Sequence, residues 1–191
     1  MEAATIVLLG WIGGDSWDDF ASSPEAGDGA PNPLDRWSRR VIDAIAGDLG
    51  ATALYPFVGP PWLPFRRWAM KAEPVAASPL GILIHPDWGL WHSYRGALAF
   101  REGLDLPATA ARASPCASCA AKPCLSACPV SAFSGEGYDV AGCRAHIATP
   151  AGTDCMSGGC LARISCPVGA AHRYTGAQAT FHMRAFSRPG P

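Results

Sequence analysis

All eight cysteines of this 191-residue chain lie between positions 116 and 166. Residues 1–115 contain no cysteine, although they carry all seven tryptophans. Thiols spaced this closely either bond to one another in pairs or bind a metal together, and a reducing compartment favours the metal. The cysteine segment therefore has to fold around whatever joins its thiols, whereas residues 1–115 are left to form an ordinary hydrophobic core.

The cysteines form two related runs. The first reads Cys116-x2-Cys119-x4-Cys124-x3-Cys128-Pro129, and the second reads Cys143-x11-Cys155-x4-Cys160-x5-Cys166-Pro167. Both runs end in Cys-Pro-Val followed by small residues. This duplicated plan is similar to that of bacterial two-cluster ferredoxins, in which the fourth cysteine of each run ligates the other cluster.

A [4Fe–4S] cube needs four thiolates that converge on a body a few ångströms wide, and small neighbouring residues leave room for it. By the crossed scheme, the first cluster is expected on Cys116, Cys119, Cys124 and Cys166. The second cluster is expected on Cys128, Cys143, Cys155 and Cys160. Eight cysteines thus supply two clusters with none left over, which predicts an iron–sulfur protein that transfers electrons.

The first run departs from the bacterial spacing. The gap between its second and third cysteines is x4 where the bacterial run has x2, and longer loops change cluster exposure and potential.

Zinc and disulfides are the alternatives to iron–sulfur clusters. Zinc sites favour two C-x2-C pairs, and only Cys116 and Cys119 form one. Disulfides require an oxidising compartment. His146, three residues after Cys143, is an alternative ligand or tuning group.

Charge and hydropathy exclude other classes of function. The formal net charge is −1, and no stretch approaches the roughly 20 apolar residues that a membrane span needs. Acidic Glu2 stands where a signal peptide has basic residues. We therefore expect a cytoplasmic protein with no membrane span and no DNA partner, whose partner is a redox protein.

Residues 1–115 predict a small α/β domain. Apolar runs indicate strands at Thr5–Leu9, Thr52–Val58 and Gly81–His85, and a three- and four-residue apolar spacing indicates a helix at Pro33–Asp48. Strand, helix and strand in succession form a crossover unit, which predicts a partly parallel sheet. The expected fold class is α+β, with domain 1–115 packed on a ferredoxin-like module at 116–170 and followed by a tail at 171–191.

Two blocks resemble the epoxyqueuosine reductase family, which is related to the corrinoid-dependent reductive dehalogenases. The first block runs from Leu80 to Leu98 and contains Gly81-Ile-Leu-Ile-His and Trp88-Gly-Leu-Trp. The second is the cysteine block, in which Cys143 stands far ahead of the last three cysteines. Together they cover about residues 80–168.

The resemblance implies that cobalamin binds in the α/β domain, so a corrinoid-dependent reductase is an alternative function. The family's acidic residue before a proline has no counterpart at Val58-Gly59-Pro60-Pro61. The family also has a longer N-terminus, and C-terminal helical repeats that grip tRNA. We therefore do not expect epoxyqueuosine reduction or tRNA binding, and we assign no catalytic residue.

Overall fold

The computed structural model describes residues 3–135 and 137–188. The chain divides into two compact units by its internal contacts. One, the sheet unit, comprises the described residues up to Pro74 together with His92–Ala111. The other, the cysteine unit, comprises Val75–Trp91 and the described residues from Arg112 onward. Helices and antiparallel strands are both present, so the fold class is α+β, as expected from the sequence.

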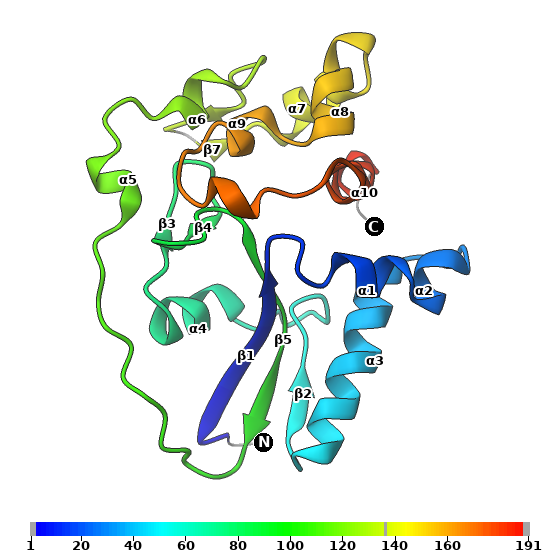
Figure 1. The fold of residues 1–191 in the computed structure, drawn as a ribbon, viewed down its shortest axis with the longest axis vertical. Helices are drawn as coiled ribbons and strands as arrows, with labels where there is room; N and C mark the ends of the chain where they lie inside the picture. Colours follow the sequence, from blue (N-terminus) through cyan, green and yellow to red (C-terminus); the bar gives the residue numbers. More distant parts are fainter. Residues whose placement is uncertain (1–2, 136, 189–191) are drawn as a thin grey trace. The chain divides into compact units, whose positions relative to one another are not determined.

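The sheet unit contains a three-stranded antiparallel sheet (Figure 1). Its strands are β1 (Thr5–Ile12), β5 (His92–Phe100) and β2 (Thr52–Leu54), in the order β1-β5-β2. The prediction of a partly parallel sheet was wrong. β1 and β2 run in the same direction, as a crossover requires, but β5 lies between them and pairs antiparallel with both.

Helix α3 (Pro33–Asp48) has the predicted bounds. Proline stands at its first turn and Gly50 follows its end with a φ of 63°, which are the favoured residues at these places. Ile42 and Ala46 face the core, whereas Ile45 and Leu49 are exposed. A Cβ on Gly96 would lie 2.6 Å from Ile42 Cδ1, so this glycine lets α3 approach β5 closely.

Three further helices complete the sheet unit: α1 (Trp17–Ala21), α2 (Pro24–Gly27) and α4 (Phe65–Ala72). The ring of Trp37 meets Trp11 and Phe20 edge to face, at centroid distances of 5.5 and 5.8 Å. Arg40 Nε donates to Glu25 at 2.6 Å, which ties α2 to α3.

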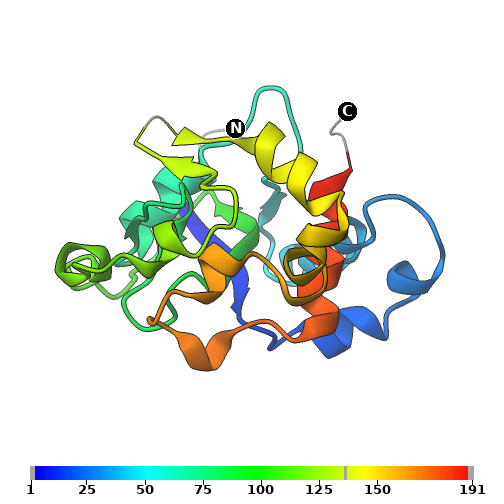
Figure 2. The ribbon, with the colours of Figure 1, turned by 90° about the horizontal axis from the view of Figure 1, so that it is seen from above.

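The cysteine unit is built from short elements. Two hairpins pair β3 (Ala76–Ala77) with β4 (Leu83–Ile84) and β6 (Phe133–Ser134) with β7 (Gly137–Tyr138). The helices are α5 (Pro115–Ser118), α6 (Pro123–Ser126), α7 (Val140–Ile147), α8 (Thr153–Gly158), α9 (Leu161–Ile164) and α10 (Gly176–Ser187), with 3-10 turns at Pro150–Gly152 and Ala170–His172. Helix α10 lies beside α7 and α8 in both views (Figures 1 and 2).

The boundaries of these units differ from the division expected at residue 115. Val75–Trp91 belongs with the cysteines because Leu80, Ile84 and Leu90 are buried against Cys124 and Cys166. The predicted strand Gly81–His85 is correspondingly short, as β4, and pairs within this unit. Helix α10 occupies most of the segment expected as a tail. Among the described residues, no helix combines the length and apolarity needed to cross a bilayer.

Candidate metal centre

The eight cysteines lie on or beside the short helices of the cysteine unit, and all are free thiols. Cys116, Cys124, Cys143 and Cys155 lie within α5, α6, α7 and α8. Cys119 ends α5 and Cys160 begins α9, while Cys128 and Cys166 follow α6 and α9. Prolines begin α5 and α6, where a missing N–H costs no hydrogen bond. Short helices of this kind bring several thiols to one place without a long loop.

The first set of thiols comprises Cys116, Cys119, Cys124 and Cys166. Burial raises the pKa of Cys116, and the charges of Cys166, Cys124 and Cys119 raise it further. Burial also raises the pKa of Cys124, with added effects of Cys166 and Cys119. Coulomb effects weaken with distance, so these four thiols are neighbours. They are the four assigned to the first cluster from the sequence.

The second set comprises Cys128, Cys143, Cys155 and Cys160. Burial raises the pKa of Cys155, and the charges of Cys143 and Cys128 add to this effect. Burial likewise raises the pKa of Cys160, with added effects of Cys143 and Cys155. Each set therefore combines three cysteines of one run with the last cysteine of the other run.

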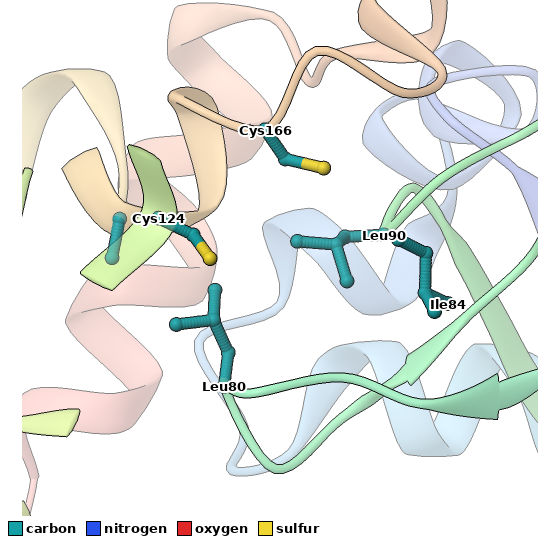
Figure 3. Packing of buried hydrophobic residues seen from close by; sticks show 6 residues of the cluster. Leu80, Ile84, Leu90, Cys124 and Cys166 are labelled. Carbon is teal, nitrogen blue, oxygen red and sulfur yellow. The ribbon is translucent and has the colours of Figure 1, made fainter. Parts of the chain in front are cut away.

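An apolar cluster supports the first set (Figure 3). Leu80, Ile84 and Leu90 are at most 6% exposed and pack with Cys124 and Cys166. Figure 3 shows the side chain of Leu80 directed towards Cys124. The side chain of Leu90 extends towards the space between the sulfur atoms of Cys124 and Cys166. An apolar lining of this kind lowers the local dielectric around bound charge.

One thiol of the second set accepts a hydrogen bond from the backbone. The amide of Ala132 donates to Cys128 Sγ at 3.3 Å. The amide of Leu161 lowers the pKa of Cys155, and those of Ala162 and Arg163 lower the pKa of Cys160, against the larger effect of burial. The side chain of Tyr138 lies near the fourth thiol, Cys143. Donors aimed at sulfur stabilise thiolates, which are the form that binds metal.

The two runs share a left-handed turn shortly after their last cysteine. Three residues after the last cysteine of each run stand Ser131 and Gly169, and both have a left-handed backbone, with φ of 49° and 68°. Helices α6 and α9, which precede these two turns, pack against each other. Ser131 adopts a conformation that few residues tolerate, which indicates that the turn is imposed by its surroundings.

Within residues 3–135 and 137–188, no three His, Cys, Asp or Glu side chains are close enough together to hold one ion. Thiolates on one zinc ion lie about 2.3 Å from the metal, and so within about 4 Å of one another. Thiolates on a [4Fe–4S] cube bind different corners of a larger body. The number of thiols, eight, and their gathering into two sets of four fit two such cubes.

Several residues near the cysteines were not assigned from the sequence. Tyr138 contacts the second set, and Arg163, between Cys160 and Cys166, donates to the carbonyl oxygen of Leu90. Both contacts depend on how segments far apart in the sequence pack together, so the spacing of residues along the chain does not predict them. His146 was considered from the sequence, and its Nε2 atom is buried without a hydrogen-bond partner among the residues that the structure describes.

Comparison of the chain with protein families, with curated proteins and with solved structures found no match.

Proposed function

We propose that this protein binds two [4Fe–4S] clusters and transfers single electrons between redox partners. The observation that carries the proposal is the grouping of the eight thiols into two sets of four, each drawing one member from the other sequence run. Crossed sharing of this kind is how bacterial two-cluster ferredoxins arrange their ligands.

The chain's own residues would perform the tasks that such a site needs. The two sets would supply the eight thiolate ligands, and Ala132 donates a hydrogen bond to Cys128 Sγ. Leu80, Ile84 and Leu90 exclude water from the first set. When bound, each cluster would accept one electron from a donor protein and return one electron to an acceptor protein.

Zinc is a poorer explanation of these thiols. Two structural zinc ions would also use eight cysteines, but each would draw four sulfurs to within about 4 Å of one another. Zinc sites also favour two C-x2-C pairs, and only Cys116 and Cys119 form one.

The compartment and the family relationship belong to the same proposal. Free thiols and oxygen-sensitive clusters suit a reducing compartment, so we propose that the protein acts in the cytoplasm. We also propose, from the resemblance of residues 80–168, a relationship to the epoxyqueuosine reductase family. The main proposal does not include corrinoid binding, which incubation with cobalamin would reveal.

The test is anaerobic purification followed by iron and sulfide analysis and by EPR of the reduced protein. We expect a brown protein with about eight iron and eight sulfide per chain, and signals of two interacting [4Fe–4S] clusters. A colourless protein with two zinc ions and no acid-labile sulfide would overturn the proposal. A corrinoid spectrum after incubation with cobalamin would instead add a reductase activity to the clusters.

A further inference from the structure

A cavity opens between helix α3 and strand β2 of the sheet unit, which lie against each other (Figure 1). Its volume is about 530 Å³. Small-molecule sites typically measure about 300–1,000 Å³, so the cavity has the size of such a site. Its lining combines one cation, one anion and a wall of small and apolar side chains, and all of these residues belong to the sheet unit.

The two charged side chains of the lining are held apart by a tyrosine. Arg39 and Asp43 stand one turn apart on α3, where opposite charges ordinarily pair. Tyr55, which is 5% exposed, donates its hydroxyl to Asp43 Oδ1. The guanidinium of Arg39 lies over the ring of the same tyrosine, 4.4 Å from its centroid. Each charge is therefore positioned by Tyr55 and not by the other charge.

Both charges remain available to a ligand. In the part of the chain that the structure describes, Arg39 forms no ion pair, so its N–H groups can bind an anion. Asp43 accepts from Tyr55 with Oδ1, which leaves Oδ2 for a cation. A ligand that carries an anionic and a cationic group satisfies both side chains, whereas a simple anion would be repelled by Asp43.

The rest of the lining suits an apolar body. Leu54 and Leu63 contribute to it, and so does Val58, whose exposed fraction of 47% a ligand would reduce. Gly47 keeps the space open, because a Cβ built on it meets nothing within 4 Å. In the sheet order β1-β5-β2, β2 stands at an edge, and such an edge can pair with the amide of an extended peptide.

We propose that this cavity binds a small zwitterion with an apolar body, namely a dipeptide with apolar side chains and free ends. The carboxylate of the dipeptide binds Arg39 and its ammonium group binds Asp43. Its side chains cover Val58 and Leu63, and its amide lies along β2. The inference concerns the sheet unit alone and holds whether or not the thiols carry clusters.

Isothermal titration calorimetry of the full chain with leucyl-leucine tests the proposal. Two blocked forms of this probe, N-acetyl-leucyl-leucine and leucyl-leucinamide, each lack one of its two charges. We expect a single site per chain for leucyl-leucine. Each blocked peptide should bind about tenfold more weakly or worse, because it leaves one charged side chain without its partner.

Two variants assign the charges. Arg39→Met removes the cation, and Asp43→Asn removes the anion but keeps an oxygen that accepts from Tyr55. Each should weaken the binding of leucyl-leucine about tenfold or more. Arg39→Met should no longer distinguish leucyl-leucine from leucyl-leucinamide, and Asp43→Asn should no longer distinguish it from the acetylated peptide. A purely structural role of either residue would leave both preferences in place.

A further variant tests the location of the site. Gly47→Met should fill the cavity and abolish binding. The matched control is Gly27→Met on α2, where an added Cβ likewise meets nothing within 4 Å and which does not line the cavity. This control should bind leucyl-leucine as the wild-type protein does.

The wild-type protein alone can refute the inference, even if a variant fails to fold. Absence of binding at millimolar leucyl-leucine would overturn it, and so would equal affinity for the free and the blocked peptides. A longer blocked peptide that bound more tightly would also overturn it, because it would pair along β2 without using the charges. Unchanged binding by a folded Gly47→Met variant would place the ligand elsewhere and refute the site.

Discussion

Arg163 donates two hydrogen bonds to the carbonyl oxygen of Leu90, at 3.1 and 2.5 Å. Its guanidinium also lies 4.4 Å from the ring centroids of both Trp91 and Tyr174. Because Arg163 is on α9 between Cys160 and Cys166, this contact joins the segment Val75–Trp91 directly to the helix that separates the two sets of thiols.

Replacing Arg163 should therefore loosen the cysteine unit. Arg163→Met keeps much of the side-chain length but loses the charge-assisted hydrogen bonds and both ring contacts, a loss of about 3 kcal/mol. We expect a lower denaturant midpoint and faster iron release, followed by visible absorbance under anaerobic conditions. Arg184, exposed on α10, provides the control, and an equal effect of Arg184→Met would contradict this role of Arg163.

Gly89 should resist substitution more strongly than Gly81. Both glycines have a left-handed backbone, with φ of 59° and 77°. A Cβ on Gly89 would lie 2.0 Å from the carbonyl oxygen of Val168, whereas a Cβ on Gly81 meets nothing within 4 Å. Gly81→Ala should cost about 1 kcal/mol of backbone strain, and Gly89→Ala about 3 kcal/mol because the clash adds to it. Thermal unfolding of the two variants measures the difference, and equal melting temperatures would refute the close approach.

The crossed assignment of ligands predicts which cluster each cysteine variant loses. Cys166→Ala should remove the cluster of the first set and keep that of the second, even though Cys166 belongs to the second run. Cys128→Ala should do the reverse. About four iron atoms per chain should remain in each variant, and EPR distinguishes the survivors. If the two variants lost the same cluster, the crossed scheme would be wrong.

The ion pair between Glu25 and Arg40 should make the sheet unit sensitive to acid. The hydrogen bond from Arg40 lowers the pKa of Glu25 from 4.5 to about 2. A carboxyl group whose pKa is lower in the folded state stabilises the fold above its unfolded pKa, and this contribution disappears as the pH falls from 4.5 towards 2. Arg40→Met should weaken the protein at neutral pH and flatten this part of the stability curve. Denaturant unfolding at several pH values checks it, and parallel curves for the two proteins would rule it out.

Local signals predicted part of the fold and of the site. The bounds of α3 follow from Pro33 and Gly50, which act on the nearest turn of helix. These local signals do not predict which distant strands pair in the sheet. β5 occupies the centre of the sheet although its sequence contains Arg95 and Gly96, and its partners lie far away along the chain. The burial of Ile42 instead of Ile45 likewise depends on where β5 passes beneath α3.

The grouping of the cysteines was expected for a different reason. A cysteine followed by proline, repeated in two runs, predicts two mixed sets of four thiols, and the charges that act on Cys116 and Cys155 come from members of these same sets. The amide of Ala132, which donates to Cys128 Sγ, follows the left-handed turn at Ser131, so its direction depends on the finished backbone. Spacing therefore predicted which thiols lie near one another but not the amide that donates to one of them. The clusters themselves stay a prediction.

If the protein holds the proposed clusters, the four-residue helix α9 has a consequence for the speed of electron exchange. Cys160 directly precedes α9 and Cys166 lies two residues after its last residue, Ile164, and the two cysteines belong to different sets. Only five residues separate them along the chain, so no hinge or diffusing shuttle would be needed between the two clusters. In a loaded chain the slow event would then be the encounter with another molecule, and turnover should follow the concentration of that molecule until it saturates.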